Sequence, residues 1–285
     1  MRLQDSMIAM LRHAGRARRT EAEYCREFRR FLSSLGHDRP LRVRREDVVS
    51  YLDLVGSSSL TRRRVAHAAL RFFYVHVVYR PEVVAGIPWP RARRSLCEGP
   101  RWFDAHKVVE AVSDPAARAV LSVIAASGLR IGEALSLRVE DVQPERDAQG
   151  RKLDHGVLVV RRGKGGKARL TPLPPTLMSV LRQYWTVARP VGFLFPAWRR
   201  HSSHICASKV RRELRAACLR VGVPVVTPHQ LRHTFARTML ERGVDLPTLQ
   251  AALGHTRAST TAVYLHVRRD RVAAMPDLLA GPSKR

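Results

Sequence analysis

Apolar side chains recur at intervals of three and four residues through the first third of the chain, a spacing typical of amphipathic helices. The predicted helices span residues 20–34, 46–55 and 60–79. Gly36 follows the first pattern as a stop signal, and Ser59 precedes the third as a residue whose side chain can cap a helix. The pattern therefore predicts a helical domain over residues 1–88.

A linker is predicted after this helical domain. Residues 81–100 contain four prolines, two glycines and a small cluster of arginines, a composition typical of a linker. We therefore predict a helical domain over residues 1–88, a linker over 89–100 and a second domain over 101–285.

The second domain mixes helical and strand-like patterns. Helical spacing covers residues 104–112, 115–126, 175–187, 206–220, 228–243 and 245–254. Alternating segments at 156–161 and 168–173 flank a glycine-rich turn and predict a β-hairpin. We interpret the polar stretch from Pro144 to His155 as a long turn between strands. The predicted fold class is mainly α with a small antiparallel β-hairpin or sheet.

Charge and cysteine content narrow the partners and the compartment. Lys and Arg number 51 against 24 Asp and Glu, which gives a formal net charge of +27. This balance favours a polyanion such as nucleic acid, because each basic side chain on a phosphate releases condensed counterions. The cysteines lie far apart, so we expect neither a disulfide framework nor a zinc ribbon, and we predict a reducing, cytoplasmic compartment. No run of about 18 apolar residues occurs, so no membrane span is expected.

The densest cluster of polar groups is the segment PHQLRH at residues 228–233. On a helix His229 and Arg232 share one face, where a proton acceptor and a cation can act on the same group. His229 and His233 also have the spacing of two zinc ligands on a metalloprotease helix, but Gln230 stands where that motif needs a glutamate base. The residues favour acid–base and oxyanion chemistry over a metal site, with a purely structural cluster as the remaining alternative.

Three further segments carry candidate chemistry. Arg130 follows a turn and opens a helix, with Glu133 one turn later. Lys164 lies in the glycine-rich turn, which is not a P-loop because it lacks GxxxxGK[ST] and precedes a strand, so no nucleoside triphosphate is implied. Tyr264 follows His255 by nine residues. A tyrosine hydroxyl can attack phosphorus at neutral pH only with a proton acceptor and cations nearby.

Taken in order, these groups resemble those of the tyrosine recombinases, also called phage integrases, with an arrangement similar to the Xer and integrase types. The resemblance rests on the segments SGLRIGEALSL, GKGGKARLTPL, PHQLRHTFA and LGHTRASTTAVYLHV. It covers essentially the whole chain, because a helical core-binding (SAM-like) domain, a linker and a catalytic domain follow one another in that family. The resemblance therefore implies an enzyme that cuts and rejoins DNA.

The resemblance assigns six catalytic residues: Arg130, Lys164, His229, Arg232, His255 and Tyr264. It implies that Tyr264 attacks a scissile phosphate to form a 3′-phosphotyrosyl bond and free a 5′-hydroxyl. The two arginines would stabilise the charge of the transition state, and Glu133 would support Arg130. Lys164 would protonate the departing oxygen, His229 would exchange a proton with the tyrosine, and His255 would bond the phosphate. Lys167, and after it Lys152, stay open as alternatives to Lys164.

The resemblance also implies the partners. They are double-stranded DNA and further copies of this chain, assembled as a tetramer on two duplexes, and the need for an accessory protein stays open. Neither a metal ion, ATP nor another cofactor is implied. A C-terminal segment docks onto a neighbouring protomer in this family, and residues 268–279 are the candidate here.

Two pairs of arginines are candidate DNA contacts. Arg62 and Arg63 lie in the first turn of the predicted helix 60–79, and Arg211 and Arg212 lie on the helix 206–220. A solvated basic face is the alternative for each pair.

Three classes of function stay open. They are a recombinase of integrase or transposon type, a non-catalytic sequence-specific DNA-binding protein of the same fold, and a topoisomerase-like nicking and closing enzyme. The complete set of six residues favours the recombinase.

Overall fold

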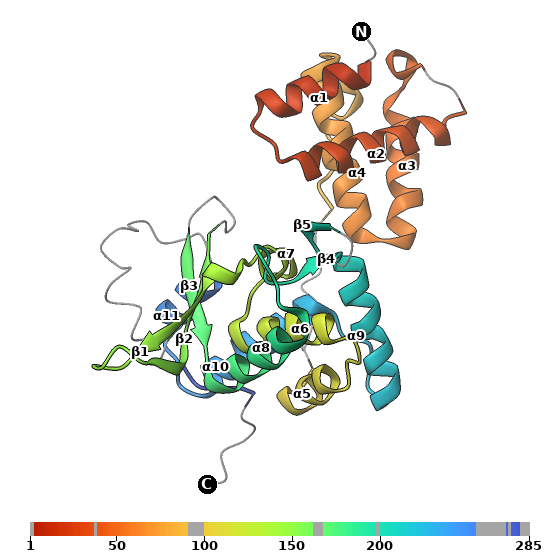
Figure 1. The fold of residues 1–285 in the computed structure, drawn as a ribbon. Helices are drawn as coiled ribbons and strands as arrows, with labels where there is room; N and C mark the ends of the chain where they lie inside the picture. The colour runs from red at the N-terminus through yellow and green to blue at the C-terminus, as the bar shows by residue number, and fades with distance from the viewer. Residues whose placement is uncertain are drawn as a thin grey trace. The chain divides into compact units, whose positions relative to one another are not determined.

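The computed structural model describes residues 3–36, 39–90, 100–161, 168–197, 200–254, 272 and 275–279. The chain divides into two compact units, one within residues 1–96 and the other within 97–285 (Figure 1). Among the described residues, no helix is both long and apolar enough to cross a membrane.

The first unit is a bundle of helices. Its described α-helices are α1 Leu3–His13, α2 Arg18–Ser34, α3 Arg45–Ser58 and α4 Leu60–Phe72. Helices α2 and α3 both pack on α4, and α1 packs on α2. Their apolar faces, together with the turn that follows α4, bury a core that includes Phe28, Phe31, Leu52, Phe73 and Tyr74. The predicted cap of α4 is confirmed, because the Ser59 side chain accepts a hydrogen bond from the backbone N–H of Arg62.

The predicted helix over 60–79 is helical as far as Val77, but only its first part is an α-helix. The α-helix ends at Phe72, and the chain continues as a π-helical turn over Phe73–Val77. The consecutive side chains of Phe73 and Tyr74 are both fully buried, and the Tyr74 hydroxyl donates to the carbonyl of Pro40 at 3.1 Å. We attribute the wider turn to this packing, because a regular α-helix turns successive side chains in different directions.

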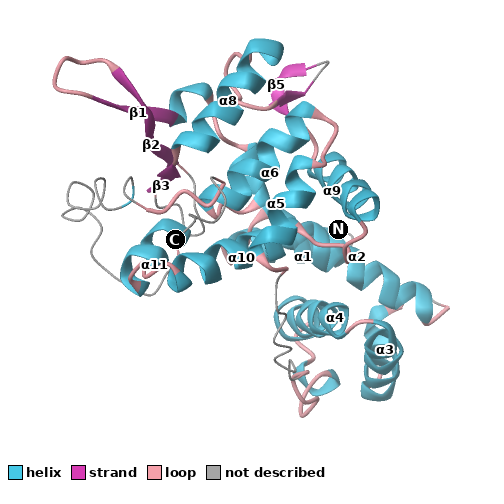
Figure 2. Cartoon of the chain, turned by 90° about the horizontal axis from the view of Figure 1, so that it is seen from below, coloured by secondary structure: helices cyan, strands magenta, loops and turns pink. Residues whose placement is uncertain are grey.

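The second unit surrounds one apolar helix. Its described α-helices are α5 Trp102–Glu110, α6 Pro115–Ser127, α7 Ile131–Leu135, α8 Pro175–Ala188, α9 Ala207–Val221, α10 Pro228–Glu241 and α11 Leu246–Leu253. Helix α6 is buried on almost every side and contacts α5, α8, α9 and α10 (Figures 1 and 2). Its N-terminus is capped by Asp114, and it ends at Gly128, which has a left-handed φ of +65°.

A three-stranded antiparallel sheet lies at one side of the second unit (Figures 1 and 2). Its strands are β1 Val142–Arg146, β2 Lys152–Val160 and β3 Arg169–Leu173, in that spatial order. A second small sheet joins β4 Pro196–Ala197 to β5 Arg200–His204. The predicted fold class, mainly α with a small antiparallel sheet, is confirmed. The second sheet was not predicted, because β4 has only two residues and the sequence of β5, RHSSH, is polar throughout and shows no alternation.

The interpretation of Pro144–His155 as a long turn is wrong. Pro144 pairs with Gly156 and Arg146 pairs with Lys152, so most of this stretch belongs to β1 and β2. The turn between them is tightened by the Asp147 carboxylate, which accepts backbone hydrogen bonds from Gln149 and Arg151. In this half of β2 exposed residues alternate with half-buried ones, whereas the second half is largely buried. Polar side chains occupy both faces, so the alternation of apolar and polar residues that marks a half-buried strand is lost.

The described part of the C-terminal segment packs on the unit's own surface. Met275 and Leu278 are buried, and the Asp277 carboxylate accepts hydrogen bonds from the backbone N–H and the hydroxyl of Thr176 at the start of α8. Arg242 donates to the carbonyl of Asp277 at 3.0 Å. Residues 275–279 thus lie on their own unit in the single chain.

Candidate active site

One buried carboxylate, Glu133, lies at the centre of a polar cluster in the second unit. Its Oε2 accepts a hydrogen bond of 2.9 Å from the backbone N–H of Arg130, which caps the start of α7. Its Oε1 accepts a second hydrogen bond, of 2.8 Å, from Nη1 of the Arg130 side chain. Only 7% of the Glu133 side chain is exposed, against 34% of the Arg130 side chain. Glu133 therefore holds Arg130 while leaving about a third of its side chain exposed.

A second arginine, Arg169, binds the same carboxylate from β3. Its terminal nitrogens donate to both oxygens of Glu133, at 3.1 and 2.6 Å, and its Nε donates to the carbonyl of Ala252 at 2.8 Å. Only 9% of the Arg169 side chain is exposed. Sequence reasoning missed this residue. The sequence did contain a signal for it. Arg169 lies on the same face of the strand as Thr171 and Leu173, which are both buried, so an arginine on that face needs a buried partner.

The third arginine, Arg232 on α10, is the most deeply buried of the three, with 6% of its side chain exposed. Its Nη1 donates to the carbonyl of Gly128 at 2.6 Å, and its Nη2 donates to that of Leu253 at 2.7 Å. These carbonyls lie at the C-terminal ends of α6 and α11, where the helix dipoles place partial negative charge. The nearest Glu133 oxygen is 3.8 Å from Nη1. Two helix ends and one carboxylate thus fix Arg232.

The charges in the cluster shift two pKa values. Burial by itself raises the pKa of Glu133, but hydrogen bonds from Arg169 and Arg130 outweigh it and hold that pKa below its ordinary value. Burial, followed by the charge of Arg130, lowers the pKa of Arg232 to about 10. Glu133 is therefore ionised and Arg232 protonated at neutral pH, and the cluster carries net positive charge.

His229 lies near this cluster on the exposed side of α10. Burial, then the charges of His233, Arg232 and Arg130, lower its pKa below the ordinary value of histidine. Its Nε2 lies 3.0 Å from Nε2 of His233, one helical turn later. A neutral imidazole beside two guanidinium groups is suited to accepting a proton from a group bound near them.

The zinc interpretation gains no support from the described residues. Gln230 is engaged in the helix cap, where its side chain accepts from the backbone N–H of Thr227 at 2.8 Å while the Thr227 hydroxyl accepts from the N–H of Gln230. Among the residues that the structure describes, no three His, Cys, Asp or Glu side chains are grouped closely enough to hold a metal ion.

Four candidate residues lie outside the described residues: Lys164, Lys167, His255 and Tyr264. Strands β2 and β3 flank the segment with the two lysines, and α11 ends two residues before His255. Lys152 is the first residue of β2, at the opposite end of the strand from Val160, which pairs with Arg169. Eight residues of strand separate those ends by about 26 Å. The structure thus brings Arg130, Glu133, Arg232 and His229 together and places Lys152 far from them.

Comparison with known proteins identifies the family. A model described as the phage integrase family matches residues 104–271, and one described as the phage integrase N-terminal SAM-like domain matches residues 3–82. A protein of Sinorhizobium fredii named as an integrase/recombinase is 34% identical over 265 residues, which cover 90% of this chain and 81% of the relative. The chain belongs to the phage integrase family of tyrosine recombinases. It is therefore a tyrosine-type site-specific recombinase, an enzyme that cleaves and rejoins DNA.

Other tyrosine recombinases share parts of the sequence and the fold. The tyrosine recombinase XerA of Pyrococcus horikoshii is 34% identical over 180 residues, which cover 62% of this chain and 60% of that protein. A lambda integrase tetramer bound to a Holliday junction has a TM-score of 0.70 at 15% identity, with 99% of this chain and 78% of that chain covered. The XerH site-specific recombinase bound to difH has a TM-score of 0.62 at 19% identity, with 87% and 77% covered. These two structures show the shared fold.

The arginines predicted to contact DNA differ in their surroundings. In the first unit, Arg62 contacts Glu27 through Nε at 3.3 Å, and Arg63 contacts Asp53 through Nη2 at 2.9 Å. In this recombinase's second unit, Arg211 and Arg212 are exposed on α9, with Nη2 of Arg212 3.4 Å from Glu213. Both arginines of the first pair thus contact a carboxylate. Both arginines of the second pair are exposed to solvent, and Arg212 also lies near Glu213.

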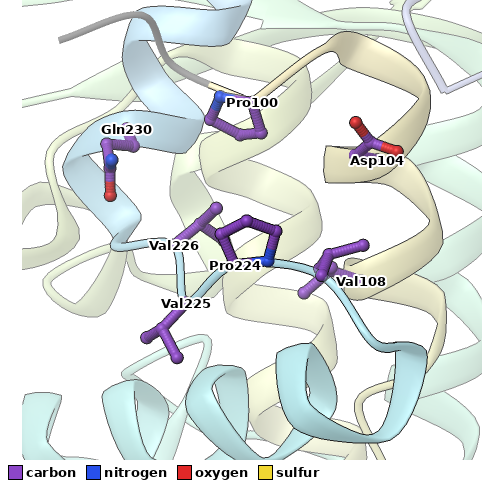
Figure 3. Close-up of a pocket in the computed structure, with 8 residues that line it drawn as sticks. Pro100, Asp104, Val108, Pro224, Val225, Val226 and Gln230 are labelled. Carbon is purple, nitrogen blue, oxygen red and sulfur yellow. The ribbon is translucent and has the colours of Figure 1, made fainter.

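A pocket of about 190 Å³ lies between α5 and the segment that leads into α10 (Figure 3). Its described lining is mostly valine and proline, with Asp104 as the one charged member and Gln230 at the α10 side. No residue of the Glu133 cluster belongs to that lining. An apolar pocket with an aspartate does not suit a phosphate, so the arginine cluster is the better candidate for the recombinase's chemistry.

Proposed function

We propose that this recombinase cleaves one phosphodiester of double-stranded DNA through Tyr264 and forms a 3′-phosphotyrosyl intermediate. The observation that supports it most strongly is the Glu133 cluster. It fixes two guanidinium groups, those of Arg130 and Arg232, beside the lowered-pKa imidazole of His229. Positive charges that the protein holds in place stabilise the extra negative charge of a phosphoryl-transfer transition state.

The proposed steps balance in atoms and protons. The Tyr264 hydroxyl oxygen bonds to phosphorus and gives its proton to His229. The bond from phosphorus to the 5′-oxygen breaks, and that oxygen takes a proton from Lys164, or from Lys167 as the alternative. Arg130 and His255 bind the non-bridging oxygens, and the positive charge of the buried Arg232 stabilises the negative charge on them. Rejoining is the reverse, with a 5′-hydroxyl from the exchanged strand attacking the phosphotyrosine, so no ATP is consumed and protein cations neutralise the charge.

The proposed partner is duplex DNA bound by several copies of the chain. Structural relatives are described as dimers and tetramers bound to DNA. For this chain we assign backbone contacts to Arg62, Arg63, Arg211 and Arg212. Arg62 also lines a pocket of about 250 Å³ in the first unit, whose other lining residues are Glu23, Arg26, Glu27, Arg30, Ser59, Thr61 and Val65. Its arginines outnumber its carboxylates, and Ser59, Thr61 and Arg62 lie at the N-terminal end of α4, which suits a phosphate.

The proposed organisation keeps a DNA-binding domain over residues 1–88, a linker over 89–100 and a catalytic domain over 101–285. We propose an integrase or transposon type for the reaction, because two Sinorhizobium fredii relatives are both named as integrases/recombinases and are matched over 81% and 80% of their lengths. Attachment repeats flanking the gene would support that type, and their absence would favour resolution of chromosome dimers.

Covalent trapping tests the proposed chemistry. The full chain is incubated with a pool of duplexes of random core sequence, with nicks that let a cleaved fragment diffuse away. Protein that remains joined to DNA after denaturation is collected, and its DNA is sequenced. We expect the wild type to give adducts on one family of sequences and Tyr264→Phe to give none.

The same measurement separates the alternatives. Sequence-selective binding with no adduct would indicate a DNA-binding protein that keeps the fold, and adducts without sequence preference would indicate a nicking and closing enzyme. A Tyr264→Phe variant that forms adducts as the wild type does would overturn the assignment of the nucleophile.

A further inference from the structure

Arg169 joins the ends of three segments that each lead to a candidate catalytic residue. Its two terminal nitrogens bind both oxygens of Glu133, which in turn holds Arg130, and its Nε binds the carbonyl of Ala252 near the end of α11. In the sequence, Arg169 follows Lys164 by five residues, and Ala252 precedes His255 by three.

Stability alone does not account for this arrangement. Arg169 and Glu133 are both more than nine-tenths buried, and removing two charges from water costs about as much as their attraction returns. An apolar pair of similar volume would hold β3 against α7 equally well. A bidentate pair does something that an apolar pair cannot do, because it fixes the plane and direction of both groups.

The close fit around Arg169 supports the same conclusion. Gly254 ends α11 with a left-handed φ of +69°, and a Cβ atom there would come within 3.0 Å of Cδ and Nε of Arg169. The guanidinium also adds to the positive charge that acts on Arg232. Arg169 therefore contacts both α7 and α11, and it acts on α10 through its charge.

We propose that Arg169 is a positioning residue: it fixes the Glu133 carboxylate, and through it the guanidinium of Arg130, while anchoring the end of α11. This role deepens the proposed function and rests on it. The reacting phosphate would be touched by Arg130, whose side chain is one-third exposed, and not by Arg169. A small shift of Glu133 would turn Arg130 away from the phosphate and slow the chemical step without weakening DNA binding.

The variant Arg169→Lys tests this role. Lysine keeps the positive charge, but its single ammonium group cannot bind both oxygens of Glu133 and the carbonyl of Ala252 together. With a duplex recovered from the wild-type adducts, we expect the single-turnover cleavage rate to fall about 10- to 100-fold, by analogy with the loss found when the partners that orient metal ligands are removed. The affinity for that duplex should stay at the wild-type value. Glu133→Asp, which withdraws the carboxylate from Arg130 and keeps its charge, should give the same separation of rate from affinity.

A matched control and a double variant separate positioning from general damage. Arg151→Lys changes an exposed arginine of the β1–β2 turn, paired with Asp147 at 2.6 Å, and should alter neither rate nor affinity. In a Glu133→Gln background, Arg169→Lys should slow cleavage little further, because the two residues act through one contact. Equal losses of rate and affinity, fully additive losses in the double variant, or an Arg169→Lys rate equal to that of the wild type would each overturn the role.

A further experiment tests the Arg169–Glu133 contact without DNA. Carboxyl NMR of the full chain follows the titration of Glu133, whose pKa should rise in Arg169→Lys because a hydrogen-bonding partner that lowers it is weakened. An unchanged titration would overturn the positioning role whether or not the protein cleaves DNA. A shifted titration in a wild type that forms no adduct would instead contradict the proposed function and leave the Arg169–Glu133 contact established.

Discussion

The two units each contain a buried carboxylate that is shared by arginines, and they use it differently. Glu27 in the first unit accepts from Nη1 of Arg30 at 2.7 Å, from Nε of Arg62 at 3.3 Å and from the Tyr51 hydroxyl at 3.3 Å. It thereby ties α2, α3 and α4 together while both arginines stay substantially exposed. Such pairs contribute little to stability and leave the cations able to meet a phosphate.

Glu133 in the second unit does the opposite. Arg169 and Arg232 are buried around it, and only Arg130 keeps an accessible part. Buried cations that are saturated with hydrogen bonds cannot move to follow a ligand, so they define a direction. The two clusters show two uses of arginine in one basic chain. Exposed arginines are suited to binding DNA phosphates, and arginines fixed around a buried carboxylate are suited to the chemical step.

The largest effect is expected for Arg232→Met. It leaves the carbonyls of Gly128 and Leu253 without their donor, at a cost of about 1–3 kcal/mol for each buried group, and cleavage should be undetectable. The matched change in the first unit, Arg62→Met, should cost about 0–1 kcal/mol, because the side chain is substantially exposed. Urea unfolding of both variants measures the difference, and equal losses would contradict the division between the two clusters.

A smaller but clear difference is expected at two left-handed glycines. Gly36 in the first unit has φ +68°, and among the described residues other than its chain neighbours no atom lies within 4 Å of the place that a Cβ would take, whereas a Cβ on Gly128 would meet Phe235 at 2.5 Å. Gly36→Ala should therefore cost only the strain of the left-handed backbone, about 1–2 kcal/mol. Gly128→Ala should add about 1–3 kcal/mol of overpacking and slow cleavage by moving the acceptor of Arg232. Thermal unfolding measures both, and similar losses would argue against a tightly fitted cluster.

Next in size is the effect of changing exposed arginines of the second unit. Arg211→Ala and Arg212→Ala should weaken binding of the recovered duplex more than they slow its cleavage, since both side chains lie on the surface of α9. The slope of log affinity against log salt should become shallower by about 1 for each phosphate that the variant no longer neutralises. Unchanged affinity at physiological salt would remove these residues from the DNA interface.

The smallest expected effect is a shift in pH dependence. The pKa of His229 is lowered by burial, then by His233, Arg232 and Arg130, and the neutral form is the one that accepts a proton. His233→Asn removes one of these causes while both arginines remain. The pKa of His229 should then rise, and the ascending limb of the cleavage rate should move to higher pH. A limb that stays in place, or moves to lower pH, would show that His229 is not the proton acceptor.

The sequence predicted the elements better than it predicted the cluster. Helices with a capping residue at one end and a glycine at the other, such as the one that begins after Thr227, can be predicted from the residues at their ends. Arg130, His229 and Arg232 were assigned from motifs, and their meeting in one place depends on packing around α6. Arg169 was missed because its partners are 36 and 83 residues away in the sequence, and no local rule pairs an arginine with a distant carboxylate. The β1–β2 hairpin was mistaken for a turn because the residues next to its loop are mainly polar and exposed or half-buried, so they show no clear alternation of apolar and polar side chains.

The most direct test of the division between the two clusters compares Arg62→Gln and Arg130→Gln on the same duplex, with affinity and single-turnover cleavage measured in parallel. Arg62→Gln should weaken binding and leave the cleavage rate of the bound complex unchanged. Arg130→Gln should leave binding near the wild-type value and slow cleavage by about 10²–10³-fold, the loss typical of removing one donor to a transition-state oxyanion. If both variants lost the same property to the same extent, the two clusters would not divide binding from chemistry.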